Sequence, residues 1–290
     1  MKHAYLILAH TEFELLRLLI SCLDDPRNDI YVHFDKKVAV LPELQTRLAG
    51  LTVLDRRIDV RWGAPSMVEA ELVLFEAALA QGPYQYYHLL SGVDLPLKSQ
   101  DYIHDYFDRH AGEEFIGYTW TEMPDNFKRK VRCWHLFPEQ FKSRNWCIRA
   151  LRAGFLRLQE GLGIYRNKEI DFKKGSQWVS LTEDMVRYLI AHKDWIHKTF
   201  SHTFCCDELV VQTLCWMSPY RINIHSLASD GEGCMRIIGW RENPGSEEWI
   251  LKDWTEADYE TLTGSLALFA RKFNSENRAF LGKICELATR

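Results

Sequence analysis

The sequence contains no run of about 18 consecutive apolar residues, so it predicts no transmembrane helix, and any membrane contact would be peripheral. The start of the chain lacks the apolar stretch and the small-residue cleavage site of a secretory signal peptide. The 8 cysteines form no C-x-x-C pair, and no histidine spacing completes a zinc site. We therefore expect reduced, buried cysteines in a cytoplasmic protein, with a membrane-peripheral location left open.

Several catalytic motifs are also missing. The chain has no G-x-x-x-x-G-K-[ST] phosphate loop, no G-x-G-x-x-G after the first strand, no G-x-S-x-G and no H-E-x-x-H. It also lacks Asp-x-Asp, the pair with which many nucleotide-sugar enzymes hold a divalent ion on the diphosphate. If such a substrate is used, cationic side chains have to offset the charge of the leaving group.

Excess positive charge is absent as well, since the formal net charge is −4. A nucleic acid is therefore not expected as the main partner, because phosphate backbones are bound by basic surfaces. One local basic stretch, Lys128-Arg129-Lys130 with Arg132, is either an anion site or an ordinary solvated face.

The first third of the chain alternates strand and helix signals. Short apolar runs predict strands at 4–9, 30–34, 51–54 and 86–90, and amphipathic patterns predict helices to about 23, over 66–80 and over 99–109. Thr11 and Glu14 have the spacing of a capping box, and Ser99 is a candidate cap. This order predicts an α/β protein with a mostly parallel, Rossmann-like sheet flanked by helices.

The rest of the chain is less regular. We expect strands at 115–117, 178–180, 222–224 and 235–238, and helices at 150–162, after Thr182, at 208–216, at 256–270 and at 276–288. No repeat or linker divides the chain, which favours a single domain over 1–290. Ligands of such sheets bind beyond the carboxyl ends of the strands, which places His10, Asp35 and the 91–98 loop on one rim.

Six segments together resemble the core-2/I-branching β-1,6-N-acetylglucosaminyltransferase and peptide O-xylosyltransferase family, as a bacterial-type member. They lie in family order and share the family's residue patterns. They are AYLILAH (4–10), IYVHFDKK (30–37), RWG (61–63) before the 66–80 helix, YHLLSGVDLPLK (87–98), GSQWVSL (175–181) before Asp207-Glu208, and LFARKF (268–273).

The resemblance implies a GT-A type fold with a nucleotide-binding part at about 1–115 and an acceptor and catalytic part at about 116–290. It also implies an inverting, metal-independent transfer from a UDP-sugar, with N-acetylglucosamine or xylose as the favoured sugar, to a glycan or polysaccharide hydroxyl. No cofactor is expected, because the UDP-sugar is a co-substrate. The chain departs from the animal enzymes in being short and in lacking their anchor and disulfide set.

The resemblance assigns the catalytic base to Glu208, whose alternative role is to favour a helix N-terminus electrostatically. It assigns the diphosphate clamp to Arg236 and Lys272, although surface charge is the commoner role of either residue. Arg271 lies next to Lys272, and the sequence does not decide which of the two points inward.

Leu8, His10 and Asp35 resemble the nucleotide-contacting elements of the family. The alternatives are a structural histidine and a turn-capping aspartate. Asp94 and Trp178 are candidates for binding donor or acceptor sugar. Asp94 could instead tie its own loop together, and Trp178 could belong to the core.

The remaining acceptor-side candidates are Glu114, Tyr118 and Trp120. Two other functional classes remain open at this stage: a different nucleotide-dependent α/β transferase, and a non-catalytic sugar-binding module on the same fold.

Overall fold

The computed structural model describes residues 1–119, 125–244 and 249–289. Its main sheet has the order β3-β2-β1-β4-β6. The strands are β1 (His3–Ala9), β2 (Asn28–Phe34), β3 (Gly50–Val53), β4 (Tyr86–Ser91) and β6 (Ser180–Thr182). The first four are mutually parallel and β6 runs antiparallel to β4, so the predicted α/β class with a mostly parallel sheet is confirmed.

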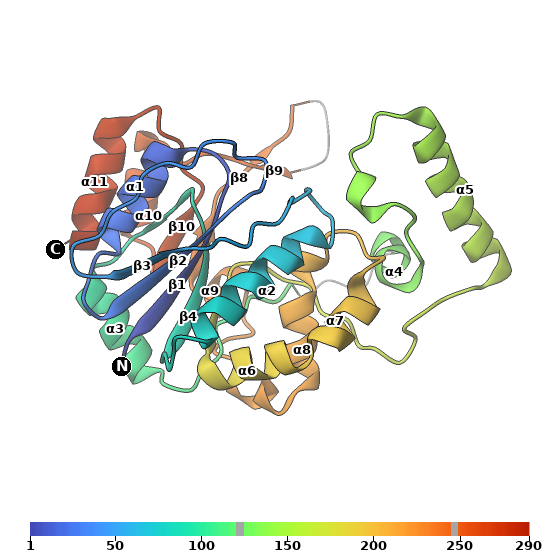
Figure 1. Ribbon diagram of the computed structural model, residues 1–290, viewed down its shortest axis with the longest axis horizontal. Helices are drawn as coiled ribbons and strands as arrows, with labels where there is room; N and C mark the ends of the chain where they lie inside the picture. The colour runs from blue at the N-terminus through green and yellow to red at the C-terminus, as the bar shows by residue number, and fades with distance from the viewer. Residues whose placement is uncertain (120–124, 245–248, 290) are drawn as a thin grey trace.

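The main sheet is covered on both faces, and successive residues of β1 divide between them. Leu6 and Leu8 belong to the core that contains α2 (Ser66–Leu79), α6 (Glu183–Ala191) and α8 (Val210–Met217). Tyr5 and Ile7 point into the other core, with α1 (Phe13–Cys22), α3 (Gln100–Arg109) and α11 (Arg278–Thr289). Figure 1 shows these helices on the two sides of the strands. Burial on both faces explains why β1 is an unbroken apolar run.

Smaller elements complete the described structure. A second sheet joins β5 (Asp94–Pro96), β10 (Phe269–Arg271) and β7 (Arg236–Ile238) in the order β5-β10-β7, and β8 (Trp240–Glu242) pairs with β9 (Trp249–Leu251). The remaining helices are α4 (Asp125–Arg132), α5 (Trp146–Leu162), α7 (Lys193–Phe200), α9 (Asp230–Cys234) and α10 (Tyr259–Thr263). Short 3-10 helices include η2 (Cys206–Glu208) just before α8.

Several boundaries differ from the sequence predictions. The helix expected at 256–270 is replaced by a 3-10 turn, the short α10 and strand β10, because the apolar run at its end pairs between β5 and β7. The strand expected at 222–224 falls in the 3-10 helix Pro219–Asn223. The strand expected at 115–117 is reduced to a single bridge between Phe115 and Ser180.

Two of the predicted helix starts are confirmed and one is wrong. Ser99 caps α3 by accepting from the Tyr102 amide, and Thr182 caps α6 by accepting from the Met185 amide. The predicted capping box of Thr11 is not formed, since the cap of α1 is Glu12 in a left-handed conformation. The Glu12 carboxylate instead accepts from the Ser275 amide, 2.9 Å away, so it links α1 to the segment before α11.

No helix in the described part of the chain combines the length and the apolar character that a membrane span requires. All 8 cysteines are free thiols.

Candidate active site

A cavity of about 330 Å³ opens beyond the carboxyl ends of β1 and β4. We call it the inner cavity. Leu8 and Ser91 form its floor at the strand ends. Its wall comes from segments distant in sequence, namely the 174–178 loop, η2, the start of α9 and the end of β10. The strand-end position is the one expected for ligands of a parallel sheet.

A second hollow of about 760 Å³, the outer cavity, lies beside the inner one. The two share five lining residues: His10, Asp35, Val60, Trp62 and Met67. The far wall of the outer cavity is the 139–143 segment, which leads into α5. Because the shared residues line both hollows, we treat them as one cleft that extends from the sheet edge toward α5.

Glu208 lies at the end of η2 and lines the inner cavity. Its side chain is 40% exposed, which leaves the carboxylate accessible to a bound molecule. The Nζ atoms of Lys174 and Lys130 lie 3.4 Å and 3.9 Å from Glu208 Oε2. The α8 helix begins two residues later, so η2 holds the carboxylate at the cavity wall rather than within a helix.

Two other carboxyl groups in the same wall are less exposed than Glu208. Burial raises the pKa of Asp207 to about 6, and the nearby Glu208 charge adds to this shift. Behind it, burial holds the pKa of the Glu71 carboxyl well above its usual range, and Gln177 donates to that group at 2.6 Å. Burial also raises the pKa of Asp230, which accepts from the Ser176 amide at 2.7 Å.

Arg271, which the sequence left open as the alternative to Lys272, is a cation of the inner cavity. It lies at the end of β10, directly opposite Asp94 of β5 in the ladder. Its Nη1 donates to Asp94 Oδ1 at 2.9 Å, and its guanidinium carbon lies 4.2 Å from the centre of the Trp178 ring. The carboxylate and the ring therefore fix the guanidinium at the cavity wall.

The three predicted nucleotide-binding residues lie together in the cleft. Leu8 lines the inner cavity, and His10 and Asp35 line both cavities. Asp35 accepts from the Lys37 amide at 2.9 Å and pairs with Lys37 Nζ at 2.8 Å. Burial lowers the pKa of His10, although the nearby Asp35 charge acts in the opposite direction. The lowered pKa favours the neutral imidazole near pH 7.

The two predicted diphosphate ligands do not line either cavity. Arg236 is 4% exposed, and its guanidinium donates to the Val179 carbonyl at 2.7 Å and to Ser180 Oγ at 3.0 Å. Lys272 Nζ instead pairs with Asp253 at 3.3 Å. Strand β7 directs Arg236 into the core, and at the end of β10 Arg271 rather than Lys272 lines the cavity. The predicted trio of Glu208, Arg236 and Lys272 is therefore not assembled in one cleft.

The predicted sugar-binding residues fall in three different environments. Trp178 lines the inner cavity, with 7% of its surface exposed. Asp94 is 2% exposed and holds the Ser91 amide and Arg271, so it organises the wall without lining it. Glu114 has no exposed surface and accepts from the amide and hydroxyl of Thr182.

The structure does not support a sugar contact by Glu114, because its buried carboxylate accepts from Thr182 at the start of α6. Tyr118 is likewise buried, with its hydroxyl donating to the Gln212 carbonyl at 3.2 Å. Trp120 lies outside the described residues.

Sequence reasoning missed Lys174, left open whether Arg271 or Lys272 points inward, and used Trp62 only as part of a family segment. Trp62 is 55% exposed between the two cavities, and Lys142 Nζ lies 4.0 Å from its ring centre. The position of a tryptophan in the short segment before the predicted 66–80 helix is a signal that the sequence alone could have supplied. The inward direction of Arg271 depends on the three-residue strand β10, which the sequence pattern did not reveal.

In the described part of the chain, one group of three side chains has metal-ligand geometry. His110, Glu113 and His225 present ligand atoms within 4.8 Å of one another. They lie near the start of β4, because the Tyr86 hydroxyl donates to the His110 and Glu113 carbonyls. The cleft lies at the opposite end of β4, at Ser91.

Comparisons with known proteins give one family and one structural likeness. The family model of the Core-2/I-Branching enzymes matches residues 3–263. Among solved structures, the apo form of mouse xyloside xylosyltransferase 1 is similar at 10% sequence identity, with 74% of this chain and 81% of that chain covered and a TM-score of 0.33. No curated protein sequence matches the chain significantly.

Proposed function

Because the chain belongs to the Core-2/I-branching enzyme family and is therefore a glycosyltransferase, we propose that it transfers a sugar from a UDP-sugar to a hydroxyl of a glycan or polysaccharide acceptor. N-acetylglucosamine and xylose are the favoured sugars. The observation that carries the proposal is the inner cavity, in which a half-exposed carboxylate, Glu208, and a fixed guanidinium, Arg271, line one wall at the strand ends.

Glu208 is the proposed general base of an inverting displacement. The acceptor oxygen attacks the anomeric carbon from the face opposite UDP, Glu208 takes the hydroxyl proton, and the bond from the anomeric carbon to the UDP oxygen breaks. Of the three carboxyl groups in this wall, Glu208 has the most accessible side chain, while burial raises the pKa of both Asp207 and Asp230. A base has to reach its substrate, which favours Glu208 over its neighbours.

Arg271 replaces Arg236 and Lys272 as the proposed diphosphate ligand. A guanidinium offers paired N–H donors that match phosphate oxygens, and here Asp94 and Trp178 hold it in place before any ligand binds. Lys174 adds a second charge to the same cavity. The uridine then lies toward His10 and Asp35, where the two cavities meet.

The test of this function is the substitution Glu208→Gln. With each of UDP-N-acetylglucosamine, UDP-xylose, UDP-galactose and UDP-glucose as donor, we expect turnover to fall by about 10² to 10⁴-fold, the usual contribution of a general base. The rise in melting temperature caused by UDP should persist, because the carboxylate is assigned to the acceptor side. The matched control is Glu169→Gln, which changes an exposed carboxylate outside both cavities.

Unchanged turnover in Glu208→Gln would show that the base is another group. If UDP fails to raise the melting temperature of the wild-type protein and none of the four donors is turned over, the UDP-sugar class itself is wrong.

A further inference from the structure

Helix α5 departs from the usual distribution of side chains, because its most buried residues are not apolar. Its buried residues are polar, namely Arg152 and Gln159. Gln159 bonds both the amide and the carbonyl of Trp134, and Arg152 donates to the Phe141 carbonyl at 3.0 Å. A helix of a globular protein normally turns its apolar stripe toward the core. These hydrogen bonds and the partly buried Ile148, Phe155 and Leu156 hold the inner face of α5, while other apolar residues of the helix remain exposed.

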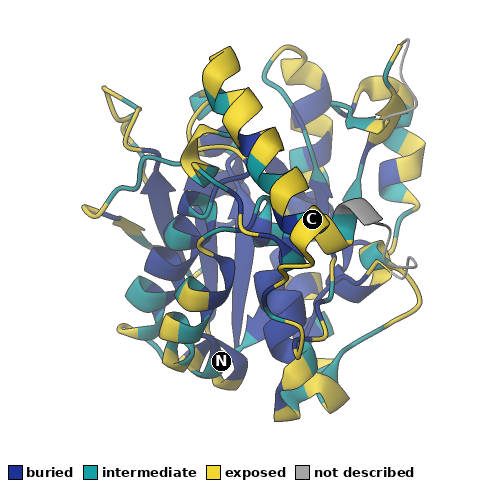
Figure 2. Ribbon diagram, turned by 90° about the vertical axis from the view of Figure 1, so that its right-hand side faces the viewer, coloured by how far each residue is buried: buried dark blue, intermediate teal, exposed yellow. Residues whose placement is uncertain are grey.

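The outward side of α5 carries large apolar side chains. Leu151, Leu158 and Leu162 are 56%, 57% and 64% exposed, and their spacing of seven and four residues places them on one face. Trp146 at the start of the helix is 76% exposed. Figure 1 shows α5 at the end of the molecule farthest from α11, and in Figure 2 it crosses the front as a mostly exposed helix.

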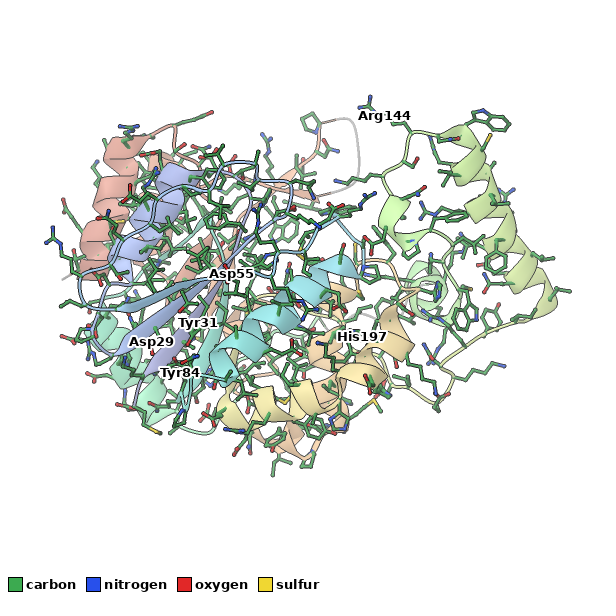
Figure 3. All side chains as sticks on the ribbon, viewed as in Figure 1. Asp29, Tyr31, Asp55, Tyr84, Arg144 and His197 are labelled. Carbon is green, nitrogen blue, oxygen red and sulfur yellow. The ribbon has the colours of Figure 1, made fainter. Side chains whose placement is uncertain are left out.

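Positive charge is concentrated in the same region. Residues 125–170 contain 11 of the 36 lysines and arginines but only 4 of the 40 aspartates and glutamates, which gives +7 here and −11 for the remainder of the chain. Arg144, just before α5, and Arg149 and Arg157 within it are exposed cations of this region. Figure 3 shows Arg144 at the outer edge of the molecule, beside the start of α5.

We propose that residues 142–168, which we call the α5 surface, bind the anionic surface of a lipid bilayer. Exposed leucines and a tryptophan enter the boundary between headgroups and acyl chains, and the surrounding arginines contact anionic headgroups. A second copy of the chain is a poorer partner, because a symmetric dimer would bring this positive surface against itself. A nucleic acid would use the cations and leave the leucines in water.

This surface adjoins the cleft. The segment from Glu139 to Ser143 lines the outer cavity and continues directly into α5. Membrane binding through α5 would thus hold the cleft entrance beside the bilayer. Only this last step rests on the proposed function, since it suits an acceptor that is carried on a lipid.

The experiment is co-sedimentation of the full chain with vesicles of phosphatidylcholine alone and of phosphatidylcholine mixed with the anionic lipid phosphatidylglycerol. We expect binding to the anionic vesicles only, weakened by added salt. Arg149→Glu with Arg157→Glu should reduce the partition coefficient by about 30-fold or more, since each surface cation contributes roughly fivefold. Leu151→Gln with Leu158→Gln should also reduce it.

The matched control is Arg47→Glu with Arg278→Glu, which changes the total charge equally at exposed positions away from α5. The circular-dichroism melting curve of each variant shows whether it is folded. If the control loses binding as much as the Arg149 and Arg157 variant does, the attraction is diffuse and the proposal fails. The proposal also fails if anionic vesicles do not bind the wild type. A wild-type dimer that the leucine variant dissociates, without vesicle binding, would assign the surface to a second copy.

Discussion

The Asp207 carboxyl group lies in an environment of the site that disfavours its ionisation. It is partly buried beside Glu208 and Glu71, and its buried Oδ1 has no hydrogen-bond partner among the described residues. Burial and the neighbouring carboxylate together raise its pKa to about 6. A desolvated carboxyl group with one unpaired oxygen is costly to ionise, so the group stabilises the fold less when it is charged.

This shift predicts a pH-dependent gain in stability for Asp207→Asn. The pKa in the folded protein is above its ordinary value of 3.8, so the folded state binds the proton more tightly than the unfolded chain does. The wild-type protein therefore loses stability as the pH rises from about 4 to about 6, and the loss is complete above that range. Asparagine cannot ionise and avoids this loss, by up to about 3 kcal/mol.

Thermal unfolding of the two proteins at pH 4 and pH 8 measures this difference. The variant should gain in melting temperature relative to wild type at pH 8 and show little gain at pH 4. Asp101→Asn is the control, because the Asp101 side chain is 82% exposed. An equal difference at both pH values would show that the Asp207 effect comes from packing and not from its charge.

At the scale of elements, Arg236 joins three strands. It starts β7, and its guanidinium reaches the Leu89 carbonyl of β4 and the Val179 carbonyl and Ser180 hydroxyl at β6. The second sheet is thereby tied to the main one beneath the inner cavity. This role differs from the phosphate binding that the family resemblance implied for the same residue.

Arg236→Gln should therefore lower the free energy of unfolding by about 3 to 5 kcal/mol, since several charge-assisted hydrogen bonds are lost from a buried site. Urea unfolding measures the change.

Arg271→Lys offers the contrast, because it keeps positive charge beside Asp94 but loses the paired donors. We expect it to weaken UDP binding by about tenfold with little change in unfolding. A stable Arg236→Gln variant that no longer binds UDP would restore the original assignment.

The elements differ in how far the sequence determines them. The strands from β1 to β4 were predicted to within about two residues, because each contains a mostly apolar run bounded by polar turns. The 256–270 segment was not, because the three residues of β10 are too few to show a strand period and their pairing with β5 and β7 is long-range. The site residues show the same difference. Leu8, His10 and Asp35 lie at the ends of the long strands β1 and β2, whereas Arg271 ends the short β10.

At the scale of the whole molecule, the positions of potential metal ligands bear on the chemistry. A divalent ion requires several oxygen or nitrogen donors that converge on one point. In the described ranges, the three-donor group that meets this condition is His110, Glu113 and His225, near the start of β4. The cleft lies at the other end of that strand, where Arg271 and Lys174 supply positive charge.

Our proposal that side chains offset the diphosphate charge predicts that glycosyl transfer survives chelation. Activity measured after dialysis against EDTA should equal that of the untreated enzyme, and added Mn²⁺ or Mg²⁺ should not raise it, because in our proposal side chains offset the diphosphate charge. The substitution His225→Ala tests the other potential metal site, because it removes a potential ligand near the start of β4, at the opposite end of that strand from the cleft. It should leave turnover unchanged. Complete loss of activity on chelation with recovery on Mn²⁺ addition would contradict the cationic mechanism. If His225→Ala lost activity without chelation, the cluster of His110, Glu113 and His225 would affect activity by stabilising the fold.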